Sequence, residues 1–106
     1  MKPILFTILA LLSPFCIQTD ASEPEKPRIV VLTDIENEPD DAQSLVRFLL
    51  YSNCFDLEGI IATTSTHQRT KTAAWRIHEI IEAYGKIRDN LLLHEPGFPE
   101  VGSLRG

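Results

Sequence analysis

A dense run of acidic residues directly after an apolar stretch constrains this chain more than any other feature. Five carboxylates fall within the eight residues 34–41, and the nearest basic residues along the chain are Arg28 and Arg47. Two carboxylates held about 4 Å apart repel by roughly 4 kcal/mol at an effective dielectric constant of about 20. A fold therefore keeps these side chains together only if they spread into water, take up protons or share a cation. Hard divalent ions such as Ca²⁺ prefer carboxylate oxygens, so a metal ion is one natural partner.

The hydrophobic pattern around this run predicts alternating strands and helices. Residues 28–33 are typical of a strand buried on both faces, and residues 57–64 predict a second one. Between them, apolar residues recur at helical spacing, with Pro39 at the first helical position and the end near residues 52–53.

A second helix is predicted over residues 70–84, where Gly85 suits a C-terminal cap. Residues 91–93 then predict a short third strand. This order predicts an α/β fold with a parallel sheet, in which ligands bind beyond the carboxyl ends of the strands. Because the polar loops 34–41 and 63–67 both follow strands, we expect them to converge at one edge of the sheet and to form a site there.

The first 21 residues have the pattern of a secretory signal peptide. They combine a positive start, a mostly apolar run at residues 4–17 and a small residue, Ala21, at a cleavage site. Cys16 leaves a lipoprotein anchor open as an alternative. We therefore expect a secreted or periplasmic protein in which residues 22–27 form a polar leader. The net charge of −5 argues against nucleic acid or an anionic membrane surface as a partner.

Residue types alone leave several interpretations of the acidic run open. The simplest is a solvated loop that places Asp40 and Asp41 at the positive end of a helix dipole. An EF-hand is excluded, because Pro39 stands where that loop needs glycine and Leu45 stands where it needs glutamate. A phosphotransferase of the haloacid dehalogenase type would use Asp34 as its nucleophile, but the neighbouring carboxylates disfavour an incoming phosphate.

The spacing of the acids also carries a family resemblance. The string Asp34-x-Glu36-x-x-x-Asp40-Asp41-Ala42 resembles the D-x-D-P-G-x-D-D-A signature of nucleoside hydrolases. The longer string 32–49 resembles more closely a group of secreted bacterial proteins with a nucleoside hydrolase-like domain that are described as cellulose-binding. The resemblance implies a Rossmann-like parallel sheet of the nucleoside hydrolase type. Since such domains are several times longer than this chain, residues 28–106 would be an incomplete, N-terminal portion.

The resemblance further implies a calcium site in the acidic loop. Glu36, Asp40 and Asp41 would bind Ca²⁺, and Asp34 would hydrogen-bond to these ligands and orient them. Glu36 would also be the catalytic base that removes a proton from a metal-bound water.

The same resemblance implies how a sugar would bind. Asn37, Asp40 and Thr66 would contact the substrate, and the reaction would be hydrolysis of an N-glycosidic or related glycosyl bond. Glu38 replaces a glycine of the signature and Glu36 replaces an aspartate, which puts nucleosides in doubt as the substrate. The alternatives are a carbohydrate-binding protein with the same fold and no catalysis, and a structural remnant. For both the hydrolase and the carbohydrate-binding protein, the partner would be a small glycoside or a cell-wall carbohydrate.

Residues outside the acidic loop carry weaker expectations. His67 in the second loop is a candidate ligand contact, whereas His78 and His94 are expected to be surface histidines. Cys54 is expected to be a small buried apolar residue. Trp75 lies off the apolar face of its helix, and we expect it to pack against a part of the protein outside this chain, with stacking on a sugar as the alternative.

Overall fold

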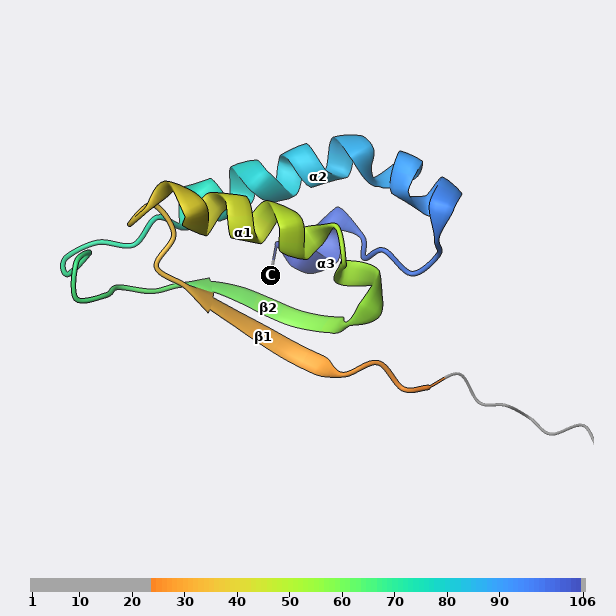
Figure 1. Cartoon of the computed structure of the whole chain (residues 1–106), viewed down its shortest axis with the longest axis horizontal. Coiled ribbons are helices and arrows are strands. Elements are labelled where there is room, and N and C mark those ends of the chain that lie inside the picture. Colours follow the sequence, from red (N-terminus) through yellow and green to blue (C-terminus); the bar gives the residue numbers. More distant parts are fainter. Residues whose placement is uncertain (1–23, 106) are drawn as a thin grey trace, which may run out of the picture.

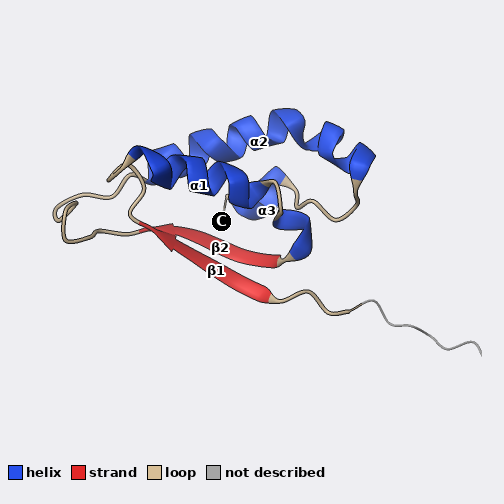
Figure 2. Cartoon of the chain, in the orientation of Figure 1, coloured by secondary structure: helices blue, strands red, loops and turns tan. Residues whose placement is uncertain are grey.

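A computed structural model describes residues 24–105 of the chain as a two-stranded sheet with helices on one side (Figures 1 and 2). The expected signal peptide, residues 1–21, lies outside the described residues. The elements in chain order are β1 (Arg28–Thr33), α1 (Pro39–Leu49), the short 3₁₀ turn η1 (Ser52–Cys54), β2 (Asp56–Ala62), α2 (Ala74–His94) and α3 (Val101–Leu104). No helix within the described range has the length and apolar character that crossing a bilayer demands.

The two strands pair in parallel, which confirms the predicted α/β class. Arg28 lies opposite Asp56 and Thr33 opposite Ala62, with one irregularity in the register after Ile29. The strand–helix–strand unit that joins them places both strand ends, and the loops that follow, at the same edge of the sheet.

Among residues 24–105, one face of the sheet is left uncovered, so the expected burial of the strands on both faces is not found there. The side chains of Val30, Leu32 and Ile61 are 50%, 66% and 51% exposed. The helices of the described residues lie on the other side of the sheet only (Figure 2). The apolar sequence of a strand indicates that both of its faces can be buried. Whether they are buried depends on other segments that cover the sheet.

Helix α1 begins where the sequence predicts. Pro39 is its first residue, and the Asp41 carboxylate accepts a hydrogen bond of 2.9 Å from the backbone N–H of Glu38, just before the helix. This contact satisfies an N–H group near the helix start and fits the capping interpretation of Asp41. Leu45 and Leu49 are buried as the helical spacing requires. The helix ends at Leu49, slightly earlier than expected.

Helix α2 runs ten residues beyond the expected end, through Gly85 and on to His94. The predicted cap at Gly85 and the predicted third strand at 91–93 are therefore both wrong. A Cβ atom on Gly85 would lie 2.7 Å from Cγ2 of Val101, so the glycine allows α3 to pack closely against α2 and does not end the helix. Three consecutive leucines fit either a strand or a helix, because a run that short shows no periodicity.

The core lies between the helices and the covered face of the sheet. Its fully or nearly buried apolar side chains are Ile35, Leu45, Leu49, Ala73, Ile77, Ile80, Ile81, Tyr84, Phe98 and Leu104. The Tyr84 hydroxyl donates a hydrogen bond of 2.8 Å to the carbonyl of Pro99, which fixes the segment before α3. Cys54 is exposed, not buried as expected, because it lies in the turn η1 at the surface.

Candidate functional site

The two strand-end loops lie against each other, as the order of elements predicts. The second loop runs over residues 63–73, between β2 and α2. The buried side chain of Gln68 in this loop donates a hydrogen bond of 3.3 Å to the carbonyl of Ile35 in the acidic loop. The Thr63 N–H donates to the carbonyl of Thr33 at 2.8 Å, which continues the pairing past the end of the sheet. Ile35 itself is completely buried and anchors the acidic loop in the core.

Glu36 follows that anchor in a left-handed conformation, with φ of 74°. Among non-glycine residues of the described chain, it alone has a positive φ. The left-handed region costs a residue with a Cβ atom roughly 1–2 kcal/mol. A turn in which the Asn37 N–H donates to the carbonyl of Asp34 at 3.0 Å holds this conformation. Strained residues of this kind gather at functional sites, where the surrounding structure holds them in place.

The carboxylate of Glu36 is paired with a cation from a distant part of the chain. Arg76, in the first turns of α2, places its Nε 2.5 Å from Oε1 of Glu36 and its Nη1 2.9 Å from Oε2 of Glu79. Its guanidinium carbon also lies 4.7 Å from the ring centroid of Trp75. The hydrogen bond from Arg76 to Glu36 is the main reason that the pKa of Arg76 is raised above its ordinary value.

Sequence reasoning missed Arg76, because it stands 40 residues from its partner. One signal was available. A helix that follows a strand in a parallel α/β unit begins near the carboxyl edge of the sheet, so charged residues in its first turns lie close to the site.

Two hollows open beside this ion pair. The first, of about 570 Å³, is lined by Glu36, Asn37 and Arg76 together with the start of α1. The second, of about 260 Å³, is lined by Glu36, Asn37 and residues 67–71 of the second loop. We call these two spaces the polar hollows. Glu36 and Asn37 line both, so these two residues are the centre of the candidate site.

The other candidate residues lie around this centre. His67 is exposed and lines the second hollow. Asp40 is exposed at the start of α1, and Thr66 is exposed in the second loop, where its carbonyl accepts a hydrogen bond from Arg69. Neither Asp40 nor Thr66 lines a polar hollow. His78 and His94 are exposed, as expected.

The described side chains do not by themselves form a metal site. Within residues 24–105, no three histidine, cysteine, aspartate or glutamate side chains gather around a common point where an ion could bind. Glu36 is paired with Arg76, and Asp41 is hydrogen-bonded to the backbone at the start of α1. The described residues alone therefore do not complete a calcium site, and the calcium site stays a prediction.

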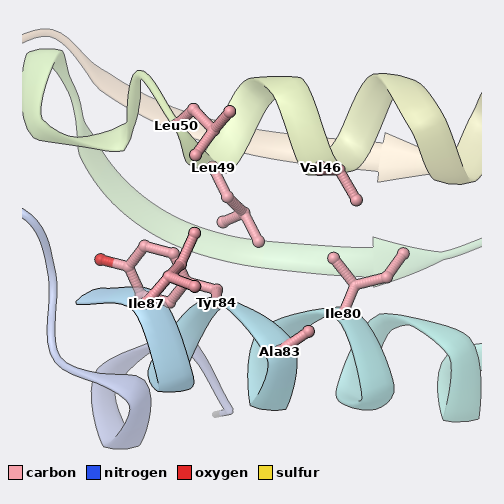
Figure 3. Close-up of a pocket in the computed structure, with 7 residues that line it drawn as sticks. All are labelled: Val46, Leu49, Leu50, Ile80, Ala83, Tyr84 and Ile87. Carbon is pink, nitrogen blue, oxygen red and sulfur yellow. The ribbon is translucent and has the colours of Figure 1, made fainter. Parts of the chain in front are cut away.

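One of the other cavities has a different chemistry. A groove of about 190 Å³ between α1 and α2 is lined by apolar side chains, among them Val46, Leu50 and Ile87 (Figure 3). It offers almost no hydrogen-bonding groups, so it does not suit a sugar or an ion.

The parallel sheet and the acidic loop at its carboxyl edge define an α/β domain with a polar site beyond the ends of its strands. The chain belongs to the family described as cellulose-binding Sde182, nucleoside hydrolase-like domain, which matches residues 28–106. A comparison with curated proteins finds no match.

A solved structure from Saccharophagus degradans supports the same fold. It is described as a nucleoside hydrolase-related hypothetical protein that is associated with carbohydrate metabolism. The sequences are 38% identical, the TM-score is 0.70, and the match covers 76% of this chain and 20% of that one. The chain thus spans about one fifth of the length of the protein that it matches.

Proposed function

We propose that this chain recognises carbohydrate through the polar hollows, as part of a secreted or periplasmic protein that binds sugar without cleaving it. The observation that carries the proposal is that Glu36 and Asn37 line both hollows at the carboxyl edge of the sheet. The family's description as cellulose-binding supports a glucan as the ligand class.

The side chains at this edge suit a ligand rich in hydroxyl groups. A hydroxyl group both donates and accepts, so its site needs acceptors and donors side by side. Glu36 supplies carboxylate oxygens, Asn37 supplies both an amide donor and an acceptor, and Arg76 supplies donors only. Because the ion pair fixes Glu36, little side-chain entropy remains to be lost when a sugar binds.

Titration calorimetry with a soluble cello-oligosaccharide tests this proposal. We expect saturable binding to the full chain and an affinity roughly tenfold lower for Asn37→Ala, since about 1.4 kcal/mol is a typical loss when polar contacts to a ligand are removed. Asn90→Ala, on the exposed surface of α2, is the matched control and should bind like the unchanged chain. Equal affinity for all three proteins, or no binding to any, would contradict the proposal.

A second candidate function is calcium-assisted hydrolysis of an N-glycosidic or related glycosyl bond. Its support is the strained backbone of Glu36, the residue at the position of the base in the nucleoside hydrolase signature. Glu36, Asp40 and Asp41 would be the calcium ligands of this candidate. Product release from nucleosides or glycosides that requires calcium and is lost in Glu36→Gln would favour it over binding alone.

A further inference from the structure

Trp75 is a large apolar side chain that the described fold leaves in contact with water. It is the only tryptophan of the chain and the second residue of α2, and it is 53% exposed. An indole ring is usually well covered, since it carries a large apolar surface. Tryptophan is also among the residues that most often carry binding energy when a partner covers them. The ring is therefore a candidate contact for a ligand.

Contacts at the start of α2 hold this ring beside the first polar hollow. The guanidinium carbon of Arg76 lies 4.7 Å from the ring centroid, which is a cation–π contact. Hydrogen bonds to Glu36 and Glu79 fix the guanidinium in turn. The start of α2 lies alongside the start of α1, whose residues line the same hollow (Figure 1). Arg76 lines this hollow and Trp75 does not, so the ring stands at its rim.

A sugar ring matches this combination of an indole and a polar hollow. The hydroxyl groups of a pyranose point outward around the ring, while its two faces are formed by C–H groups. The face of an aromatic ring carries partial negative charge and attracts the weakly positive hydrogens of such a sugar face. A protein surface apolar enough to cover Trp75 would instead desolvate the charges of Arg76 and Glu79 without supplying hydrogen bonds to them. Hydroxyl groups supply those hydrogen bonds, so the surroundings of the ring favour a sugar.

The configuration of the sugar decides how closely it can stack. In a β-1,4-glucan every ring substituent is equatorial, so both faces of each unit carry only hydrogen atoms. In the galactose configuration the oxygen at C4 is axial and interrupts one face. Flat stacking on an indole therefore favours glucose-type units, because their faces approach the ring without a steric clash.

We propose that Trp75 is a stacking platform for a glucose-type ring at the rim of the first polar hollow. The hollow binds hydroxyl groups of one sugar unit, and the indole covers the face of a neighbouring unit. The carbohydrate site thus extends along the start of α2. The inference rests on the proposed sugar recognition and adds to it the residue that selects the configuration of the sugar.

Tryptophan fluorescence of the full chain tests this inference, because Trp75 is the only source of the signal. Titration with a soluble cello-oligosaccharide should shift the emission to shorter wavelength, since the sugar displaces water from the ring. The shift should saturate over the same concentrations as the heat measured by calorimetry. A galacto-oligosaccharide of the same length should bind roughly three- to tenfold more weakly, which is the range expected for the loss of one aromatic contact.

Three variants separate stacking from a general effect of exposed aromatic residues. Trp75→Ala should bind the cello-oligosaccharide roughly three- to tenfold more weakly. Trp75→Phe keeps an aromatic face and should retain most of the affinity. Tyr51→Ala is the matched control, because it removes another exposed aromatic ring, beyond the opposite end of α1, and should bind like the unchanged chain.

Unchanged emission on sugar binding, or equal affinity of Trp75→Ala and the unchanged chain, would overturn the inference. If Asn37→Ala still weakens binding in that case, sugar recognition through the polar hollows stands without the platform. Absence of binding to every protein would refute both proposals. Emission typical of a buried indole before sugar is added, with resistance to quenching by acrylamide, would mean that protein covers the ring and would also overturn the inference.

Discussion

The close contact between α2 and α3 at Gly85 decides whether the substitution Gly85→Ala stabilises or destabilises the protein. A glycine inside an exposed helix costs about 1 kcal/mol relative to alanine, so Gly85→Ala would ordinarily stabilise the protein. Here the new Cβ atom would lie 2.7 Å from Cγ2 of Val101. Carbon atoms pack best at about 3.5–4.0 Å, so the two helices would have to separate by about 1 Å.

Val101 cannot easily turn away, because its β-branched side chain has one strongly preferred rotamer in a helix. Overpacking of this kind costs roughly 1–3 kcal/mol. After subtraction of the helix-propensity gain, we expect Gly85→Ala to lower the free energy of unfolding by about 1 kcal/mol. For a chain of this size, this corresponds to a fall in melting temperature of roughly 4–8 °C.

A double-mutant cycle measured by urea unfolding isolates this contact. In the background Val101→Ala, the clash is gone and Gly85→Ala should stabilise the protein by up to about 1 kcal/mol. Gly102→Ala is the matched control, because a Cβ atom there meets nothing within 4 Å and should be neutral or stabilising. If Gly85→Ala alone stabilises the chain, or if the cycle shows no coupling, then α3 does not pack on α2 as described.

Three further predictions concern the core and the loop. Ile81→Ala removes a fully buried side chain and should lower the free energy of unfolding in urea by about 2–5 kcal/mol. Leu93→Ala is the control: this position is 83% exposed, so stability should change by less than about 0.5 kcal/mol. Similar losses for both variants would mean that the core lies elsewhere. Gln68→Ala leaves the carbonyl of Ile35 without its side-chain donor and should cost about 1–3 kcal/mol, with faster amide exchange in the acidic loop as the readout. Burial is the main reason that the pKa of Tyr84 is raised in the folded protein. The folding stability that comes from this shift is fully present below the unfolded pKa of about 10, and it is lost as the pH rises through the folded pKa. Stability measured from about pH 9 to 12 should therefore fall less steeply in Tyr84→Phe, and an unchanged slope would contradict this account.

The parts of the fold that were predicted from sequence are those that depend on local pattern. The strand before Asp34, the helix that begins at Pro39 and the second strand all follow from hydrophobic spacing and from the position of proline. The convergence of the two loops also follows, because parallel pairing places both strand ends at one edge.

The parts that were not predicted depend on contacts between distant segments. Gly85 was predicted to end the helix because glycine commonly follows helices, but it lies inside α2 at a position where Val101 leaves no room for a Cβ atom. The alternating exposure of β1 does not follow from the apolar sequence of the strand itself, since burial of a strand depends on what covers it. Arg76 was missed because it comes from a segment far from Glu36 in the sequence, and the charge that neutralises Glu36 was missed with it.

The most direct test of the account is a map of the amide chemical shifts of the full chain during titration with a soluble cello-oligosaccharide. If the polar hollows bind sugar, saturable shifts should concentrate at Asn37 and His67, while Leu93 at the far end of α2 stays unchanged. Shifts concentrated at Val46 and Ile87 in the apolar groove, or no saturable shifts at any ligand concentration, would contradict the claim that the carboxyl edge of this sheet recognises carbohydrate.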